Sequence, residues 1–158
     1  MKTLYSVLKH NSKNKTRYLE IGVNEGDSLK VVLENTKLKH VTLIDSFGHT
    51  PHLKDFSHVE PLLKDIDYVT FQERSETALP KVKGKFDLIL VDGAHNKEDA
   101  TRDLKLTWPM LSDGGTLLFD DLRHPSHLYL LDVWKKFRLE HMDAHESSST
   151  DVGVLTKP

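Results

Sequence analysis

Two glycines four residues apart follow a glutamate in the segment RYLEIGVNEGDSL, residues 17–29. Glu20, Gly22 and Gly26 give the spacing E-x-G-x-x-x-G directly after an apolar run. A triphosphate-binding loop needs GxxxxGK followed by Ser or Thr, and a dinucleotide-binding turn needs G-x-G-x-x-G, and this segment has neither spacing. A carboxylate at the first position repels a pyrophosphate and favours a ligand that carries an ammonium or sulfonium group. We therefore expect neither a nucleoside triphosphate nor NAD at this turn.

Asp45 is a second acidic residue at a predicted strand end, because it closes the apolar run His40–Asp45. A carboxylate in this place can accept hydrogen bonds from both hydroxyls of a ribose. Together with the acidic glycine turn, it predicts a cationic derivative of adenosine as the ligand. The alternatives are a strand-to-helix turn without a ligand and an ordinary loop aspartate.

Three further aspartates, Asp92, Asp120 and Asp121, follow two other apolar runs. Carboxylates that converge at adjacent strand ends repel one another, which raises their pKa values unless a cation joins them. Oxygen ligands suit Mg²⁺ or Ca²⁺ better than zinc. Such an ion can bind two neighbouring hydroxyls of a substrate and lower the pKa of one of them. The alternative is that Asp92 builds a turn and that the Asp120–Asp121 pair caps the following segment.

The histidines include a candidate general base. His95 lies three residues beyond Asp92, and an imidazole titrates near neutral pH, so we predict His95 as the base and His124 as the second choice. The alternative for His95 is a surface histidine at a helix start. Three other histidines lie in the unpatterned segment 47–65, which we interpret as a solvated or lid segment rather than a metal site.

Apolar runs of strand length alternate with segments of helical period along the chain, which predicts an α/β fold. Strands such as LEIGV and DLILVD are apolar on both faces, as in a parallel sheet covered by helices on both sides. Right-handed crossovers then predict a doubly wound sheet, whose ligands bind outside the carboxyl ends of the strands. The predicted strands are Tyr18–Val23, His40–Asp45, Tyr68–Gln72, Phe86–Asp92 and Thr116–Asp120, and the predicted helices are Ser28–Asn35, Lys97–Leu111 and Ser126–His141. The last two segments, His141–Ser149 and Asp151–Lys157, are predicted to form an antiparallel hairpin at one edge of the sheet.

Composition limits the class of protein. A chain of 158 residues with 37% hydrophobic and 29% charged residues predicts one globular domain over residues 1–158. The formal charge of −2 gives no general attraction to nucleic acid, so we expect no such partner. No apolar run is long enough for a membrane span, the start lacks the apolar core of a signal peptide, and the chain has no cysteine. These features together predict a cytoplasmic protein.

The motifs resemble those of class I S-adenosylmethionine-dependent methyltransferases. The resemblance covers about residues 17–122 and rests on LEIGVNEGDSL, on Asp45 and on FDLILVDGAHNKEDATRDLKLTWPMLSDGGTLLFDD. It is closest to the metal-dependent branch with macrocin-type sugar O-methyltransferases, and the layout is similar to that of catechol-type enzymes. The resemblance implies a Rossmann-like, mostly parallel seven-stranded sheet of order 3-2-1-4-5-7-6 with an antiparallel last strand.

The resemblance also implies roles for individual residues. Glu20, Gly22 and Gly26 would line the methionine end of the cofactor, and Ser28 would lie near its carboxylate. Asp45 would hold the ribose. The remaining implied roles are adenine contacts for Ser46, Phe47 and Ser75 and Mg²⁺ ligation by Asp92, Asp120 and Asp121. We further predict that Asp92 contributes to cofactor binding and, together with His95 as the base, to catalysis.

Only about sixteen residues precede the first predicted strand, so the helical cap that encloses a small acceptor in such enzymes is expected to be minimal. The expected reaction is Mg²⁺-assisted methyl transfer from S-adenosylmethionine to a hydroxyl oxygen of a sugar or another vicinal diol. The acceptor can be a small molecule or a glycan, and a homo-oligomer neighbour can complete the pocket. The alternative function is a non-catalytic module that binds S-adenosylmethionine and acts through its surface.

Overall fold

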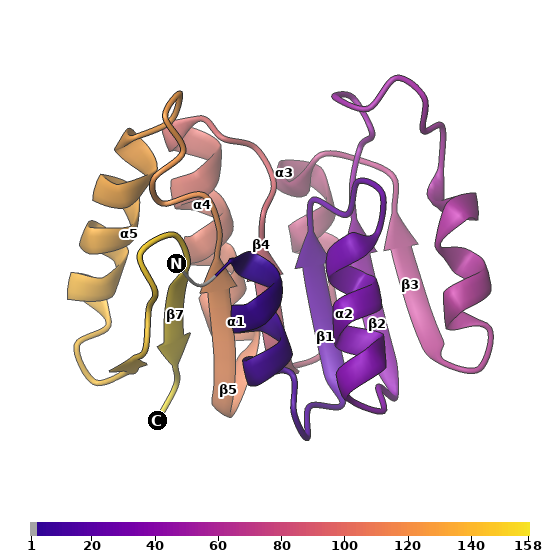
Figure 1. Ribbon diagram of the computed structural model, residues 1–158, viewed down its shortest axis with the longest axis horizontal. Helices are drawn as coiled ribbons and strands as arrows, with labels where there is room; N and C mark the ends of the chain where they lie inside the picture. Colours follow the sequence, from indigo (N-terminus) through magenta and orange to yellow (C-terminus); the bar gives the residue numbers. More distant parts are fainter. Residues whose placement is uncertain (1–2) are drawn as a thin grey trace.

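The computed structural model describes residues 3–158, which form a central sheet with helices on both faces (Figure 1). The sheet has seven strands in the order β3-β2-β1-β4-β5-β7-β6. Strands β1 to β5 pair in parallel, whereas β7 is antiparallel to both β5 and β6. The predicted fold class, strand order and antiparallel last strand are therefore confirmed. The strands are β1 (Arg17–Ile21), β2 (His40–Ile44), β3 (Asp67–Phe71), β4 (Phe86–Val91), β5 (Leu111–Phe119), β6 (His145–Glu146) and β7 (Gly153–Thr156).

The central strands bury side chains on both faces, as their continuous apolar composition predicts. In β1 and β4, Leu19 and Ile89 belong to the core on one face, and Tyr18 and Leu88 belong to the core on the other. Since successive residues of a strand point to opposite faces, Glu20 shares the face of Tyr18. This face contains buried residues of α1, α2 and the segment that follows β2.

The helices are α1 (Leu4–Asn11), α2 (Asp27–Asn35), α3 (Ser75–Ala78), α4 (Lys97–Thr107) and α5 (Tyr129–Glu140). The first two pack together, whereas buried residues of the last three belong to the core on the opposite face (Figure 1). Short 3₁₀ helices at Leu79–Lys81 and Trp108–Met110 follow α3 and α4. Within residues 3–158 we find no helix with both the length and the apolar composition that a membrane crossing requires.

Two predicted helices are shorter than expected. The predicted helix Lys97–Leu111 ends at Thr107, because Pro109 falls in a 3₁₀ turn and Leu111 already begins β5. The predicted helix Ser126–His141 begins only at Tyr129, and the residues before it form turns. The loop between β5 and α5 is therefore longer than predicted, and it lies at the carboxyl end of the sheet (Figure 1).

The segment between β2 and β3 contains two 3₁₀ helices, Phe56–His58 and Glu60–Leu63. It packs on the glycine turn, since a Cβ atom at Gly26 would lie 2.4 Å from Cγ1 of Val59. His58 adds a contact of 2.7 Å from its Nε2 to the carbonyl oxygen of Asn24. The lid predicted for this segment is thus a packed cover over the loop that joins β1 to α2.

Candidate active site

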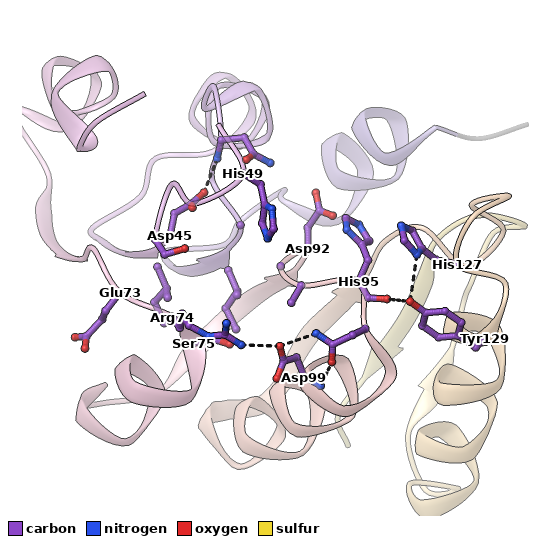
Figure 2. Close-up of a pocket in the computed structure, with 18 residues that line it drawn as sticks. Asp45, His49, Glu73, Arg74, Ser75, Asp92, His95, Asp99, His127 and Tyr129 are labelled. Carbon is purple, nitrogen blue, oxygen red and sulfur yellow. Dashed lines mark hydrogen bonds and ion pairs between the residues drawn. The ribbon is translucent and has the colours of Figure 1, made fainter. Parts of the chain in front are cut away.

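A cavity of about 650 Å³ lies outside the carboxyl ends of the parallel strands. Its volume is within the range of small-molecule sites, and its place is the one predicted for a doubly wound sheet. Asp45 and Ser75 line one end of the cavity, His127 and Tyr129 line the other, and Asp92 lies between them (Figure 2). The two ends therefore come from different halves of the sheet.

Gly22 is required by the backbone of the site. It has a left-handed φ of +86°, and a Cβ atom there would lie 1.8 Å from the carbonyl oxygen of Asp92. Only glycine permits this approach of the ends of β1 and β4. Gly22 lines the cavity, whereas Gly26 does not, because Val59 occupies the space over Gly26.

Asp45 fastens the glycine turn to the end of β2. Its Oδ2 accepts hydrogen bonds of 2.8 Å from the backbone N–H groups of both Val23 and Asn24, and its Oδ1 accepts one of 2.7 Å from Phe47. Asn24 and Phe47 have left-handed φ values of +46° and +56°, a conformation that costs non-glycine residues energy and that these bonds help to maintain. Since a carboxylate oxygen can accept two bonds, Oδ1 retains capacity for one ligand hydroxyl.

Glu20 differs from the expectation of a charged residue beside the ligand. Its side chain is fully buried and does not line the cavity. Neither carboxylate oxygen has a hydrogen-bond partner within residues 3–158. Burial raises the pKa of Glu20 to about 8, an effect that the Tyr18 hydroxyl opposes and Asp45 reinforces. The raised pKa shifts Glu20 towards its protonated, uncharged form, and its side chain lies outside the lining of the cavity.

The other predicted cofactor residues divide into two groups. Ser46 and Ser75 line the cavity, and the Ser75 hydroxyl donates a 2.7 Å hydrogen bond to Oδ1 of the buried Asp103. Ser28 and Phe47 do not line it. Ser28 is buried in α2, and the ring of Phe47 packs against Phe56 with 4.9 Å between the ring centroids.

Two of the three predicted metal ligands, Asp92 and Asp121, lie close together, and Asp120 does not lie with them. Asp92, His95 and Asp121 each place one potential ligand atom within 4.8 Å of the others, the separation that a shared divalent cation can bridge. Burial raises the pKa of Asp92 well above its usual value, and the charges of Asp120 and Asp121 raise it further. Asp120 lies outside this group and borders a small adjoining hollow, where burial raises its pKa to about 6. A cation would relieve the repulsion between these carboxylates, so the donor set fits a divalent ion.

Three histidines stack at one end of the cavity. The rings of His95 and His127 are nearly parallel with centroids 4.9 Å apart, and those of His127 and His124 are 4.8 Å apart. Nε2 of His95 lies 2.7 Å from Oδ2 of Asp121, and this bond raises the pKa of His95. Desolvation and then the charges of His95 and His124 lower the pKa of His127. His95 and His127 line the cavity and His124 does not.

His127 and Tyr129 were not predicted as site residues, because both fell within the helix predicted from Ser126. The available signal was the run HPSHLY, residues 124–129, in which histidine and tyrosine recur beside an acidic strand end. In the structure the Tyr129 hydroxyl donates to the carbonyl oxygen of His95 and lies 3.1 Å from Nδ1 of His127.

A polar network around Asp99, which the sequence patterns did not predict, builds one wall of the cavity. Oδ2 of Asp99 accepts hydrogen bonds from Arg74 at 3.0 Å and from the side chain of Asn96 at 2.7 Å (Figure 2). The side chain of Asn96 in turn accepts from the backbone N–H of Asp99 and caps α4. This network joins the loop after β3 to the start of α4.

Residues 19–122 match the family described as "Methyltransferase domain". An uncharacterized protein of Acanthamoeba polyphaga mimivirus is 28% identical over 116 residues, which are 69% of this chain and 52% of that protein. The chain thus spans about half the length of this curated relative.

Similar folds occur in two structures of complexes with S-adenosylhomocysteine. The N-methyltransferase NodS of Bradyrhizobium japonicum has a TM-score of 0.67 at 15% identity, with 99% of this chain and 89% of that chain covered. The O-methyltransferase of Bacillus cereus also has a TM-score of 0.67, at 14% identity, with 98% and 79% covered. At these identities the likeness shows the fold, and the family match covers most of the chain. The chain therefore belongs to the methyltransferase domain family.

Proposed function

We propose that this chain transfers a methyl group from S-adenosylmethionine to a hydroxyl oxygen of a sugar or another vicinal diol, as in the macrocin-type and catechol-type branch. The observation that carries the proposal is the single cavity in which Gly22, Asp45 and Asp92 meet at the carboxyl ends of β1, β2 and β4. Membership of the methyltransferase domain family supports the reaction class, and the S-adenosylhomocysteine in the structural relatives supports the methyl donor.

The donor would occupy the end of the cavity near Asp45. The free capacity of Asp45 Oδ1 suits one ribose hydroxyl, and Ser46 and Ser75 line the same end. Gly22 lines the cavity, and a Cβ atom there would meet the carbonyl oxygen of Asp92. The carboxylate of Asp45 faces this end of the cavity, where it would favour a sulfonium over a phosphate.

A divalent cation, Mg²⁺ by the preference for oxygen ligands, would be held by Asp92 and Asp121, with Asp120 as the predicted third carboxylate. When bound, such an ion lowers the pKa of an acceptor hydroxyl and fixes its orientation. Asp92 lies between the two ends of the cavity, so the chain would position the acceptor oxygen beside the donor. Alignment of oxygen, methyl carbon and sulfur then supplies much of the rate.

The proposal is tested with S-adenosylmethionine that carries a labelled methyl group. We expect label in catechol or in methyl rhamnoside, two simple vicinal diols, in the presence of Mg²⁺. A chain that binds S-adenosylhomocysteine but labels neither of these probes nor any of a panel of glycans would contradict the transfer reaction and favour the non-catalytic binding module.

Metal ligation has its own test, with Mn²⁺ as a paramagnetic substitute whose binding is followed by electron paramagnetic resonance. Asp121→Asn removes a charge from the group around Asp92, so we expect Mn²⁺ affinity to fall about tenfold or more. Asp120→Asn reports whether the predicted third carboxylate takes part, and exposed Asp113→Asn is the matched control. Methyl transfer that is unchanged in EDTA would remove the ion from the reaction.

A further inference from the structure

We propose that Nε2 of His127 is the general base that accepts the proton of the acceptor hydroxyl. The assignment rests on the proposed methyl transfer, and it differs from the sequence-based prediction of His95. His127 belongs to the loop between β5 and α5 and lines the cavity at the end opposite to Asp45 (Figure 2). If the donor lies at the Asp45 end, the acceptor lies at the His127 end.

The tautomer of His127 follows from the hydrogen bonds of Tyr129. A tyrosine hydroxyl has one proton to donate, and Tyr129 donates it to the carbonyl oxygen of His95. The contact of 3.1 Å between Nδ1 of His127 and the Tyr129 oxygen therefore needs an N–H on Nδ1. A neutral imidazole has one N–H, so Nε2 of His127 carries a lone pair.

The surroundings keep this nitrogen free and its ring fixed. Within residues 3–158 no side chain or backbone group forms a hydrogen bond with Nε2 of His127, whose ring is bonded through Nδ1. The rings of His95 and His124 stack on His127, which holds the ring plane in place. By contrast, Nε2 of His95 is already bonded to Oδ2 of Asp121.

The chemical step balances without a further reactant. The acceptor oxygen forms a bond to the methyl carbon of the donor while the bond from that carbon to sulfur breaks. The electron pair of the broken bond remains on sulfur, which changes from a sulfonium to a neutral thioether. The proton of the acceptor hydroxyl moves to Nε2 of His127, which becomes an imidazolium and later releases the proton to water.

The tautomer is tested without any acceptor, by long-range ¹H–¹⁵N correlation spectra of the full chain labelled with ¹⁵N-histidine at neutral pH. We expect His127 to be neutral with its proton on Nδ1, and its signals are assigned by their loss in His127→Asn. In Tyr129→Phe the oxygen partner is gone, so the proton is expected to shift towards Nε2, the commoner site in free imidazole. A proton on Nε2 of His127 in the parent chain, or a charged ring, would overturn the proposal.

The catalytic role is tested by His127→Asn, whose amide nitrogen can still donate to Tyr129 but which has no atom in place of Nε2. We expect kcat with catechol or methyl rhamnoside to fall about 10²- to 10⁴-fold while S-adenosylhomocysteine affinity stays unchanged. His145→Asn is the matched control, because His145 is exposed in β6 and does not line the cavity, so its kcat should change only a few-fold. A His127→Asn variant with parental kcat would overturn the assignment. A parent chain that labels no acceptor contradicts the proposed function instead, and the tautomer measurement still decides on His127.

Discussion

Glu20 is a buried acid whose carboxyl group has no hydrogen-bond partner within residues 3–158. Leaving such a group ionised in the core costs more than protonating it, which is why its pKa is raised to about 8. In its uncharged form Glu20 adds no negative charge to the site. Asp45 and Asp92 are acidic residues that line the cavity, whereas Glu20 does not line it.

A stability measurement tests the protonation of Glu20. An acid with a raised folded-state pKa contributes stability at low pH and loses it as the pH rises from its usual pKa of 4.5 to its folded pKa of about 8. Between pH 6 and pH 8, the free energy of unfolding of the parent should fall relative to that of Glu20→Gln by about 2 to 3 kcal/mol. Urea unfolding at the two pH values measures this difference, and exposed Glu34→Gln is the control. Parallel pH profiles for the parent and Glu20→Gln would contradict a buried, protonated Glu20.

The cover over the glycine turn is the element that differs most from its sequence-based description. The unpatterned sequence of segment 47–65 suggested a solvated or lid segment, yet its Val59 fills the space that Gly26 leaves open. Gly26 therefore serves the packing of the chain itself, and the contact of His58 with Asn24 adds to it. The two glycines of the motif therefore have different structural roles. Gly26 makes room for Val59, whereas Gly22 permits the close approach of the Asp92 backbone.

A double-mutant cycle tests the contact between Gly26 and Val59. Gly26→Ala places a Cβ atom 2.4 Å from Cγ1 of Val59, in addition to the cost of its φ of +86°. Val59→Ala removes that Cγ1 atom, so Gly26→Ala should cost less in the Val59→Ala background by about 0.5 to 3 kcal/mol. Gly114→Ala is the control, since Gly114 has a φ of +73° and no neighbour within 4 Å. Additive effects of Gly26→Ala and Val59→Ala on urea unfolding would contradict the contact.

The strand pattern predicted a parallel, doubly wound sheet, and the resemblance to methyltransferases implied its strand order. The strand-end rule predicted where Asp45 and Asp92 lie. Helix limits were less accurate, because the effect of Pro109 on α4 was not weighed and the turns before Tyr129 have no periodic signature. Because the helix was predicted to begin at Ser126, His127 was placed in that helix and not in the loop that lines the cavity. The burial of Glu20 depends on α1 and α2 covering one face of β1, which the spacing of a motif does not show.

At the scale of the whole molecule, the cavity lies between two halves of the sheet, one suited to the methyl donor and the other to the acceptor. The half with β1, β2 and β3 supplies the turn, Asp45 and Ser75, which suit the methyl donor. The half with β4, β5 and α5 supplies Asp92 and the histidine stack, which suit the acceptor. Because the two sets of side chains are separate, a change at the acceptor end should leave donor binding intact.

The central claim, that this cavity binds S-adenosylmethionine, is tested most directly by isothermal titration calorimetry of the full chain with S-adenosylhomocysteine, with NAD as the comparison ligand. We expect one site for S-adenosylhomocysteine and a matching rise in Tm, since a ligand that binds only the folded state stabilises it. Asp45→Asn should weaken the affinity about tenfold or more, because an amide cannot accept all three backbone hydrogen bonds of the carboxylate. No heat at millimolar S-adenosylhomocysteine, or tighter binding of NAD, would contradict the account.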